Sequence, residues 1–384
     1  GVVVFHKFIP ESGPWCIMSG TTTLMNSHLM SKSKQSKTPA NFIVGTGRCG
    51  STILSQMIDL HPKVAVLSEL FVAMDFFKKY GDRTVAGDEL ASILDCGLAS
   101  TGEMKKIAAH LATPEIAFDM ASAPITVAPS HYRDGVLPDL ILLPLANLFD
   151  DPVPVFDELI DYAREQAPRL LSEQYLILFN WMAHRAGKLI WIERSGGTIA
   201  HLPELFDLFP EGKFLHLHRN PLDACISMQN HNHFRLRTFK HYQLKTNNGI
   251  SWADLDESDL NNTMPMSEKL RSIFEHPVPL EYFLQDWSDS ILRGMAVLKD
   301  LSPNQYAEIS FEEIMAGPNA ALAQISSFFE LPAGGNWIEQ ACGLLNKGQA
   351  AHAQANVEQL ALLKEYCQSA MVLLGREPAM KIYN

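Results

Sequence analysis

The sequence predicts an α/β protein in which a mostly parallel β-sheet is flanked by helices. Short apolar segments alternate with amphipathic ones along most of the chain, as expected for buried strands that are connected by helices. The first strand, at residues 42–44, runs directly into a glycine-rich turn and the start of a helix. The chain has 384 residues, 47% apolar and 19% charged, which suffices for one large α/β domain or two smaller ones.

The other predicted elements follow from their apolar patterns. Strands are expected at residues 63–67, 188–193, 213–218 and, with a weaker pattern, 305–310. Helices are expected at residues 51–60, 200–209, 221–230, 280–299, 318–329 and 357–374, and Gly375 is placed to cap the last of them. Residues 245–279 are polar, and we expect a loop region with little regular structure there.

The pattern also predicts how the chain is divided. Residues 1–39 are expected to be a leader or linker, because a polar, low-complexity tract precedes the first strand, and this suggests a domain cut from a longer chain. Residues 40–384 would then form the catalytic domain. Within it, residues 85–185 have helical patterns interrupted by prolines, and we expect a largely helical insertion that forms a lid over the substrate pocket.

Charge and composition exclude several classes of protein. The net charge of −12 argues against a nucleic-acid binder, because binding a polyanion requires a basic surface. No apolar run approaches about 18 residues, and the N-terminus lacks the features of a signal peptide. The six cysteines lack the spacing of a zinc site or a disulfide framework. The sequence therefore predicts a cytoplasmic protein without a membrane span.

The glycine-rich turn after the first strand predicts an anion site. A strand, a loop with glycines at 45, 47 and 50, and a helix start present bare N–H groups and a helix dipole to an anion. The spacing matches the P-loop frame G-x-x-x-x-G-K-S/T, except that Ser51 replaces the lysine that binds nucleoside triphosphates. Arg48 lies inside the loop instead, which favours a phosphate-type ligand other than ATP or GTP. The alternative is a tight turn with a Ser or Thr helix cap.

A second polar cluster follows the strand at residues 213–218. Arg219 ends that strand, Pro221 suits the first turn of the next helix, and Ser227 lies two turns into it. Because ligands bind at the carboxyl ends of strands in an open parallel sheet, we expect this cluster to face the same ligand as the loop. Taken alone, such a helix start is more often structural.

Together the two clusters resemble the cofactor-binding motifs of sulfotransferases that use 3′-phosphoadenosine 5′-phosphosulfate (PAPS). In that family a loop K/R-S/T-G-S/T-T cradles the 5′-phosphosulfate, and a downstream R-N/D-P-x-D-x-x-x-S segment holds the 3′-phosphate. Residues 48–52 and 219–227 match every position of these motifs except Cys49. The resemblance implies that Arg48 contacts the transferred sulfuryl group and that Arg219 and Ser227 bind the 3′-phosphate. The cofactor-binding residues that it implies in the loop are Gly47, Arg48, Cys49, Gly50, Ser51 and Thr52.

The resemblance spans about residues 41–330 and implies the sulfotransferase fold, with a P-loop-like parallel sheet. Phe311 stands where an adenine-contacting tyrosine often sits in the family. The usual Arg-Lys-Gly element is reduced to Lys347 and Gly348. A third strand-end cluster, at residues 191–197, resembles the Lys-Thr-Pro segment that lines the active site in many members, without its proline.

The general base is left open between a glutamate and a histidine. Glu69 follows the strand at residues 63–67 and matches the glutamate that serves as base in the tyrosylprotein branch of the family; the alternative is a surface or capping carboxylate. Histidine is the base in other branches, and His131, in the lid region, or His110 would fill that role.

Four further histidines, at positions 216, 218, 231 and 233, suggest a metal site at first sight. Those flanked by leucines in a strand are more often satisfied core residues, and sulfuryl transfer in this family needs no metal. Trp181 and Trp191 are likewise expected in the core.

The resulting hypothesis is a PAPS-dependent sulfotransferase that acts on a hydroxyl and releases 3′-phosphoadenosine 5′-phosphate (PAP). Resemblance to sulfotransferases embedded in polyketide assembly lines implies a 3-hydroxyacyl chain on an acyl carrier protein as acceptor, with neighbouring domains in a larger chain. The alternatives are a free small-molecule, carbohydrate or lipid alcohol. Two other readings are a P-loop kinase or NTPase, which Ser51 disfavours, and a non-catalytic nucleotide-binding module.

Overall fold

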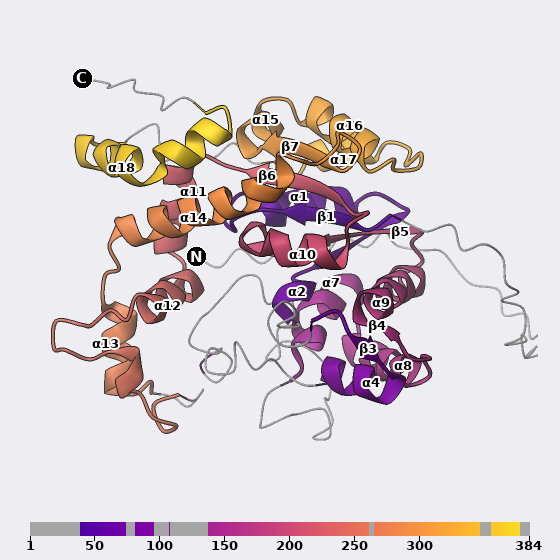
Figure 1. The fold of residues 1–384 in the computed structure, drawn as a ribbon, viewed down its shortest axis with the longest axis horizontal. Coiled ribbons are helices and arrows are strands. Elements are labelled where there is room, and N and C mark those ends of the chain that lie inside the picture. Colours follow the sequence, from indigo (N-terminus) through magenta and orange to yellow (C-terminus); the bar gives the residue numbers. More distant parts are fainter. Residues whose placement is uncertain are drawn as a thin grey trace, which may run out of the picture. The chain divides into compact units, whose positions relative to one another are not determined.

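Five parallel strands form the central sheet of the computed structural model, in the order β2-β5-β1-β6-β7 (Figure 1). The strands are β1 (Asn41–Val44), β2 (Val64–Ser68), β5 (Ile190–Arg194), β6 (Lys213–His218) and β7 (Tyr306–Ser310). The structure describes residues 39–73, 81–95, 107, 137–260, 265–345 and 355–376. The predicted α/β class and all five predicted strands are confirmed, with ends that shift by a few residues.

The sheet is buried on both faces, which explains the continuous apolar runs of its strands. Alternate residues of β1 enter different clusters: Phe42 and Val44 join one, and Ile43 joins the other. Phe42 stacks on Phe214 of β6 with ring centroids 5.4 Å apart. The two halves of the core therefore meet along the central strand, which also carries the glycine-rich loop at its carboxyl end.

Helices cover both faces of the sheet. All six predicted helical segments are confirmed, with ends that shift by a few residues, whereas the short helix at Trp337–Cys342 was not predicted. On one face lie α1 (Ser51–Asp59), α16 (Pro318–Phe328) and α17 (Trp337–Cys342). On the other lie α10 (Leu202–Leu208), α11 (Pro221–Gln229), α14 (Leu280–Leu298) and α18 (Val357–Leu373). Gly375 has a φ of 59° just beyond α18, as expected for the residue that ends a helix.

The described part of residues 85–185 is largely helical. It holds α4 (Gly87–Asp95), the π-helical turn η2 (Ile141–Leu145), α7 (Ala146–Leu148), α8 (Pro152–Arg164) and α9 (Leu171–Arg185). A short antiparallel pair, β3 (Thr84–Val85) and β4 (Arg169–Leu170), connects the start of this region to the residues directly before α9. That this region forms a lid stays a prediction, because residues 96–106 and 108–136 lie outside the described residues. Residues 1–38 of the predicted leader lie outside them as well.

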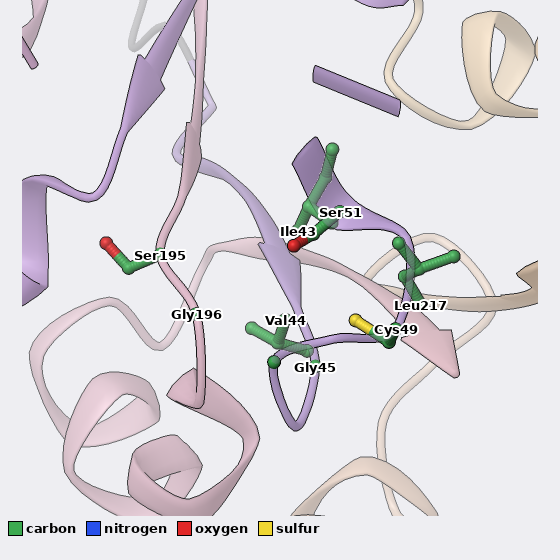
Figure 2. Close-up of a pocket in the computed structure, with 9 residues that line it drawn as sticks. Ile43, Val44, Gly45, Cys49, Ser51, Ser195, Gly196 and Leu217 are labelled. Atoms are coloured by element: carbon green, nitrogen blue, oxygen red, sulfur yellow. The ribbon is translucent and has the colours of Figure 1, made fainter. Parts of the chain in front are cut away.

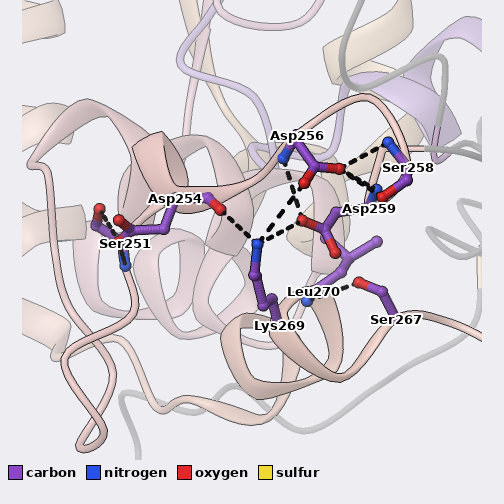
Figure 3. Close-up of polar contacts among 8 residues, drawn as sticks. All are labelled: Ser251, Asp254, Asp256, Ser258, Asp259, Ser267, Lys269 and Leu270. Atoms are coloured by element: carbon purple, nitrogen blue, oxygen red, sulfur yellow. Dashed lines mark hydrogen bonds and ion pairs between the residues drawn. The ribbon is translucent and has the colours of Figure 1, made fainter.

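The expectation of little regular structure at residues 245–279 is wrong in part. A turn of 3-10 helix, η4 (Trp252–Asp254), and the helix α13 (Glu268–Glu275) lie there. Ser267 caps α13, and its Leu270, Ile273 and Phe274 are buried, a helical spacing that the polar surroundings hide in the sequence. The preceding loop is held by Lys269, whose Nζ donates to the Asp254 carbonyl (3.0 Å) and to Asp259 Oδ2 (3.1 Å), as Figure 3 shows.

None of the described helices combines the length and the apolar character that crossing a lipid bilayer requires.

Candidate active site

The glycine-rich loop lies at the carboxyl end of β1, in a conformation that its glycines make possible. Gly47 and Gly50 have φ values of 80° and 93°, in the region that favours glycine. A Cβ atom on Gly45 would lie 2.7 Å from the Leu217 carbonyl oxygen, so β6 packs directly against the loop. Arg48, between the glycines, also has a positive φ of 51°. A non-glycine residue held in this region costs roughly 1–3 kcal/mol and recurs at functional sites.

The burial of Cys49 limits how this residue could take part in the predicted cofactor binding. Its side chain is buried beneath the loop and packs with Leu54 and Leu217 in the core. Burial raises the pKa of the Cys49 thiol. Figure 2 shows Cys49 beside Ser51 in a narrow pocket at the end of β1. Cys49 can therefore offer a ligand only its backbone N–H.

The two predicted anion-binding motifs come together at this loop. Arg48 Nε donates a hydrogen bond of 3.1 Å to Oγ of Ser227 on α11. Arg219 Nη1 lies 3.5 Å from the Arg48 carbonyl oxygen, at the limit of a hydrogen bond. The Arg219 Nε atom is buried and has no hydrogen-bond partner in the described part of the chain, and the nearest carboxylate, of Asp223, lies 3.8 Å from Nη2. A buried donor without a partner is costly, so this guanidinium is poised to take an anion.

Phe311 connects the same elements from the other side. It begins the helix α15 (Phe311–Ala316), and its ring fills the space beside Gly50, where a Cβ atom would lie 2.1 Å from Phe311 Cδ2. The Arg219 guanidinium lies 5.0 Å from the centroid of the ring, in a cation–π contact. The aromatic ring thus lies between the loop and Arg219.

Glu69 lies beside the loop and is held on both carboxylate oxygens. Oε1 forms an ion pair with Arg194, and Oε2 accepts a hydrogen bond of 2.9 Å from the Gly196 N–H. The Cβ position of Gly196 is 3.6 Å from Glu69 Oε2 and 4.0 Å from the Gly47 Cα atom, so the carboxylate and the loop share one turn of chain. Glu69 has a φ of 58°. This fixed geometry argues against a free surface carboxylate.

Arg194, in turn, is held by two serines. Its Nε donates to Ser55 Oγ on α1 at 2.8 Å, and its Nη2 to Ser68 Oγ at 3.3 Å. Only 5% of the Arg194 side chain and 13% of the Glu69 side chain are exposed. The ion pair therefore connects the ends of β2 and β5 to the helix that follows the loop.

Comparison with known proteins identifies the family of this chain. The profile of the sulfotransferase family matches residues 39–135 and 144–255, more than half of the chain. The chain belongs to the sulfotransferase family. Family membership supports sulfotransferase activity. The glycine-rich loop, Glu69, Arg194 and the Arg219 to Ser227 segment lie in the matched part, and Phe311 lies outside it.

Several solved structures are similar to this sulfotransferase-family chain. The sulfotransferase domain from the curacin biosynthetic pathway is 16% identical, with a TM-score of 0.46 over 89% of this chain and 99% of that one. The sulfotransferase domain of the olefin synthase from Synechococcus PCC 7002 is 14% identical, with a TM-score of 0.42 over 88% and 93% of the two chains. Sulfotransferase STF9 from Mycobacterium avium is 13% identical, with a TM-score of 0.39 over 87% and 77%. No curated protein sequence is significantly similar to the chain.

A buried acid that the sequence did not single out lies beneath the candidate base of this sulfotransferase. Glu193 is fully buried on β5 and accepts a hydrogen bond from Ser195 Oγ, which itself accepts one from the Phe71 N–H at 2.9 Å. Burial, with the nearby negative charge of Glu69, raises the pKa of Glu193 well above its usual range. Phe71 belongs to α2 (Leu70–Ala73), directly after Glu69, so this network fixes the segment that carries the candidate base.

Arg376 is a second residue that sequence reasoning missed. Its Nη2 donates to Glu312 Oε2 at 2.7 Å, and its Nε donates to His218 Nδ1 at 3.0 Å. Glu312 Oε1 accepts from the Asn220 N–H at 2.8 Å, directly after Arg219. Burial and the Arg376 guanidinium lower the pKa of His218 to about 4, so its ring is a neutral acceptor. The end of α18 is thus connected to the Arg219 turn.

The other predicted site residues have mixed outcomes. His131, His110, Lys347 and Gly348 lie outside the described residues. His216 is buried, as expected of a core residue, but the expectation that it is satisfied is wrong: neither ring nitrogen has a hydrogen-bond partner in the described chain, because His216 lies on a strand buried on both faces. Within the described residues, no three His, Cys, Asp or Glu side chains are grouped to hold a metal ion.

Trp191 is 1% exposed and Trp181 packs against the core, as predicted for both tryptophans.

Proposed function

We propose that this sulfotransferase moves the sulfuryl group of PAPS onto a hydroxyl group of an acceptor. The observation that carries the proposal is the convergence of two cationic anion sites, around Arg48 and Arg219, at the carboxyl end of one parallel sheet. PAPS has two separate anionic ends, and a mononucleotide triphosphate has one. The lysine that a kinase or NTPase would need at the loop is Ser51 in this chain, which counts against that alternative.

The residues at the site fit such a donor. The first-turn N–H groups of α1 have no side-chain cap and no acidic neighbour, so the helix end is open to a 5′-phosphate. The orphaned Nε of Arg219 suits the 3′-phosphate, and the Phe311 ring beside it suits the adenine. When bound, PAPS supplies an activated sulfuryl group. Gly47, Gly50, Ser51 and Thr52 would line its 5′ end, with Cys49 contributing only its backbone.

The chemistry assigned to this chain is charge stabilisation and proton removal. Arg48 would stabilise negative charge on the transferring group, the electrostatic contribution that usually dominates in such reactions. The acceptor hydroxyl would give its proton to Glu69, whose oxygens each keep a lone pair beyond their bonds to Arg194 and Gly196. His131 and His110 are the alternative bases in this proposal.

For the acceptor we propose a 3-hydroxyacyl chain on an acyl carrier protein, against a free small-molecule, carbohydrate or lipid alcohol. A cytoplasmic location and neighbouring domains of a larger chain belong to the same proposal.

Calorimetry with PAP and with ATP tests the donor. We expect PAP to bind and ATP to bind far more weakly, and we expect Arg219→Ala to weaken PAP binding at least tenfold. Arg271→Ala, at an exposed position of α13, is the matched control and should bind PAP normally. Tighter binding of ATP would overturn the proposal. PAP binding without PAPS turnover on a broad panel of hydroxyl acceptors would favour a non-catalytic nucleotide-binding module instead.

A further inference from the structure

The helix α12 (Asn232–His241) forms a wall directly beside the glycine-rich loop. A Cβ atom on Gly47 would lie 2.8 Å from Cζ of Phe234, in the first turn of α12. The helix follows α11, which carries Ser227, and it packs against α11 and α13 (Figure 1). Whatever approaches the loop from this side therefore meets α12.

The segment that contains α12 has a charge opposite to that of the protein as a whole. The chain carries 43 aspartates and glutamates and a net charge of −12, yet residues 224–253 contain neither residue. The same segment carries four cationic side chains: Arg235, Arg237, Lys240 and Lys245. Three of them, Arg237, Lys240 and Lys245, are exposed. A basic surface on an acidic protein, next to its candidate site, attracts anionic partners and repels cationic ones.

Arg235 is unfavourably placed if the chain is considered alone. It lies in the first turn of α12, where the helix dipole disfavours a cation, and that turn has no acidic residue and no side-chain cap. Its Nη2 donates to Asn232 Oδ1 at 3.1 Å, while its Nε is buried without a hydrogen-bond partner in the described chain. No carboxylate of the described residues forms an ion pair with it, and burial lowers the pKa of its guanidinium. An anionic partner would compensate all of these costs.

Arg237 extends the basic surface outward from the loop. Its guanidinium lies 5.3 Å from the centroid of the Phe234 ring, and 51% of its side chain is exposed. The carboxylate of Asp286 lies 4.0 Å away and already accepts a hydrogen bond of 2.7 Å from the Tyr242 hydroxyl, so the pairing is weak. In the acidic loop that precedes α13, the carboxylates of Asp256 and Asp259 face Lys269 at 3.9 and 3.1 Å, and the Asp254 carboxylate accepts hydrogen bonds from Ser251 (Figure 3).

We propose that α12 is a docking surface for an acidic carrier protein domain that presents the acceptor to the site. The inference rests on the proposed function and names the partner of the same site. A small neutral alcohol would gain nothing from a row of exposed cations, whereas a carrier with an acidic surface would be steered to the loop by them. Two of the exposed cations, Arg237 and Lys240, lie on α12, and Lys245 lies in the turn just beyond it.

The test compares binding of one acidic carrier at two salt concentrations. The probe is a holo acyl carrier protein loaded with a 3-hydroxyacyl chain, and its binding to the PAP-loaded enzyme is measured by biolayer interferometry. We expect wild-type affinity to fall steeply between low and high salt, and Arg237→Glu/Lys240→Glu to weaken binding roughly tenfold or more at low salt. Lys364→Glu, at an exposed position of α18, is the control variant and should bind normally. Arg235→Gln is a second, milder variant that should weaken binding in the same direction.

The docking proposal is overturned if the carrier does not bind to the wild type, or if it binds equally well to the wild type and the double variant. Activity separates this result from failure of the proposed function. With the same 3-hydroxyacyl chain on N-acetylcysteamine, the double variant should keep the kcat/KM of the wild type. With the carrier-bound acceptor, the KM of the double variant should rise while its kcat stays unchanged. An equal fall for both acceptors would show damage to the site and would also overturn the docking role. PAP binding, measured in parallel, reports on the donor site alone.

Discussion

Arg48 Nε donates a hydrogen bond of 3.1 Å to Oγ of Ser227, a residue 179 positions further along the chain. The bond joins the loop after β1 to the helix after β6, the two segments that carry the anion-binding motifs. It also fixes the direction of a guanidinium whose backbone has a positive φ. Ser227 therefore has a second role beside its implied contact with the 3′-phosphate: it positions Arg48.

Replacing Arg48 tests its assigned role in charge stabilisation. We expect Arg48→Ala to lower kcat by about 10²–10³-fold, the usual loss when one preorganised charge donor is removed, while the melting temperature changes little. If Arg48→Ala transfers the sulfuryl group as fast as the wild type, Arg48 does not stabilise charge in the reaction.

The two roles of Ser227 can be separated by Ser227→Ala. If Ser227 acts through Arg48, this variant lowers kcat, and adding it to Arg48→Ala lowers kcat no further. If Ser227 holds the 3′-phosphate, the affinity for PAP falls in both backgrounds. Steady-state kinetics of the four proteins, with calorimetric titration of PAP, distinguish these results.

Glu69→Gln tests the general base. We expect kcat to fall by about 10²–10⁴-fold, the range for loss of a positioned base, with little change in PAP affinity. The amide also leaves the buried Arg194 without its counter-ion, which destabilises the protein. Glu69→Asp keeps the charge and serves as the control: it should be more stable than Glu69→Gln and remain slow, because the shorter side chain withdraws from the acceptor. A Glu69→Gln variant with normal kcat would assign the base to a histidine.

Gly50→Ala tests how tightly the loop, Phe311 and Arg219 are packed. The added Cβ would lie 2.1 Å from the Phe311 ring at a φ of 93°, so we expect a loss of about 2 kcal/mol or more in unfolding free energy and much weaker PAP binding. Gly249→Ala is the matched control, with a φ of 79° and no atom within 4 Å, and should lose only about 1 kcal/mol. Adding Phe311→Ala to Gly50→Ala should remove the steric part of the loss. Urea unfolding measures all three, and equal losses for both glycines would contradict the packing.

Much of the fold could be predicted from the sequence because the relevant signals are local. The segment that forms β1 is buried on both faces, so Phe42, Ile43 and Val44 form a continuous apolar run that is easily recognised as a strand. The two motifs could be placed at one site because parallel strands end at one edge. Helices α12 and α13 were missed since their few buried residues, such as Leu236 and Leu270, are diluted by charged ones.

The rest of the site depends on contacts between distant side chains. The bond from Arg376 to His218 joins residues 158 positions apart, and no local pattern marks Arg376 as a partner of the Arg219 turn. The segment around Glu193 was recognised as a strand-end cluster, but which of its side chains turns inward follows only from the register of β5 between β1 and β2. Such long-range pairings are set by the assembled sheet.

The buried Glu193 predicts a pH dependence of stability. Its pKa in the folded protein is raised well above the ordinary value of 4.5, because of burial and the nearby Glu69 carboxylate. Below pH 4.5 the folded and unfolded states are both protonated at this residue. As the pH rises from 4.5 towards the raised value, only the unfolded state releases the proton, so this residue makes the folded protein progressively less stable.

Glu193→Gln should remove this dependence, because glutamine has the shape of the protonated acid and does not titrate. We expect the difference in melting temperature between Glu193→Gln and the wild type to grow in favour of the variant as the pH rises from 4.5 to 7.5. Glu193→Ala is the contrasting variant: it leaves Ser195 without its acceptor and opens a cavity beneath α2, so it should lose about 2 kcal/mol or more. Calorimetric melting at several pH values provides the measurement. A difference between Glu193→Gln and wild type that stays constant across this range would mean that Glu193 is ionised in the folded protein, with its second oxygen paired rather than protonated.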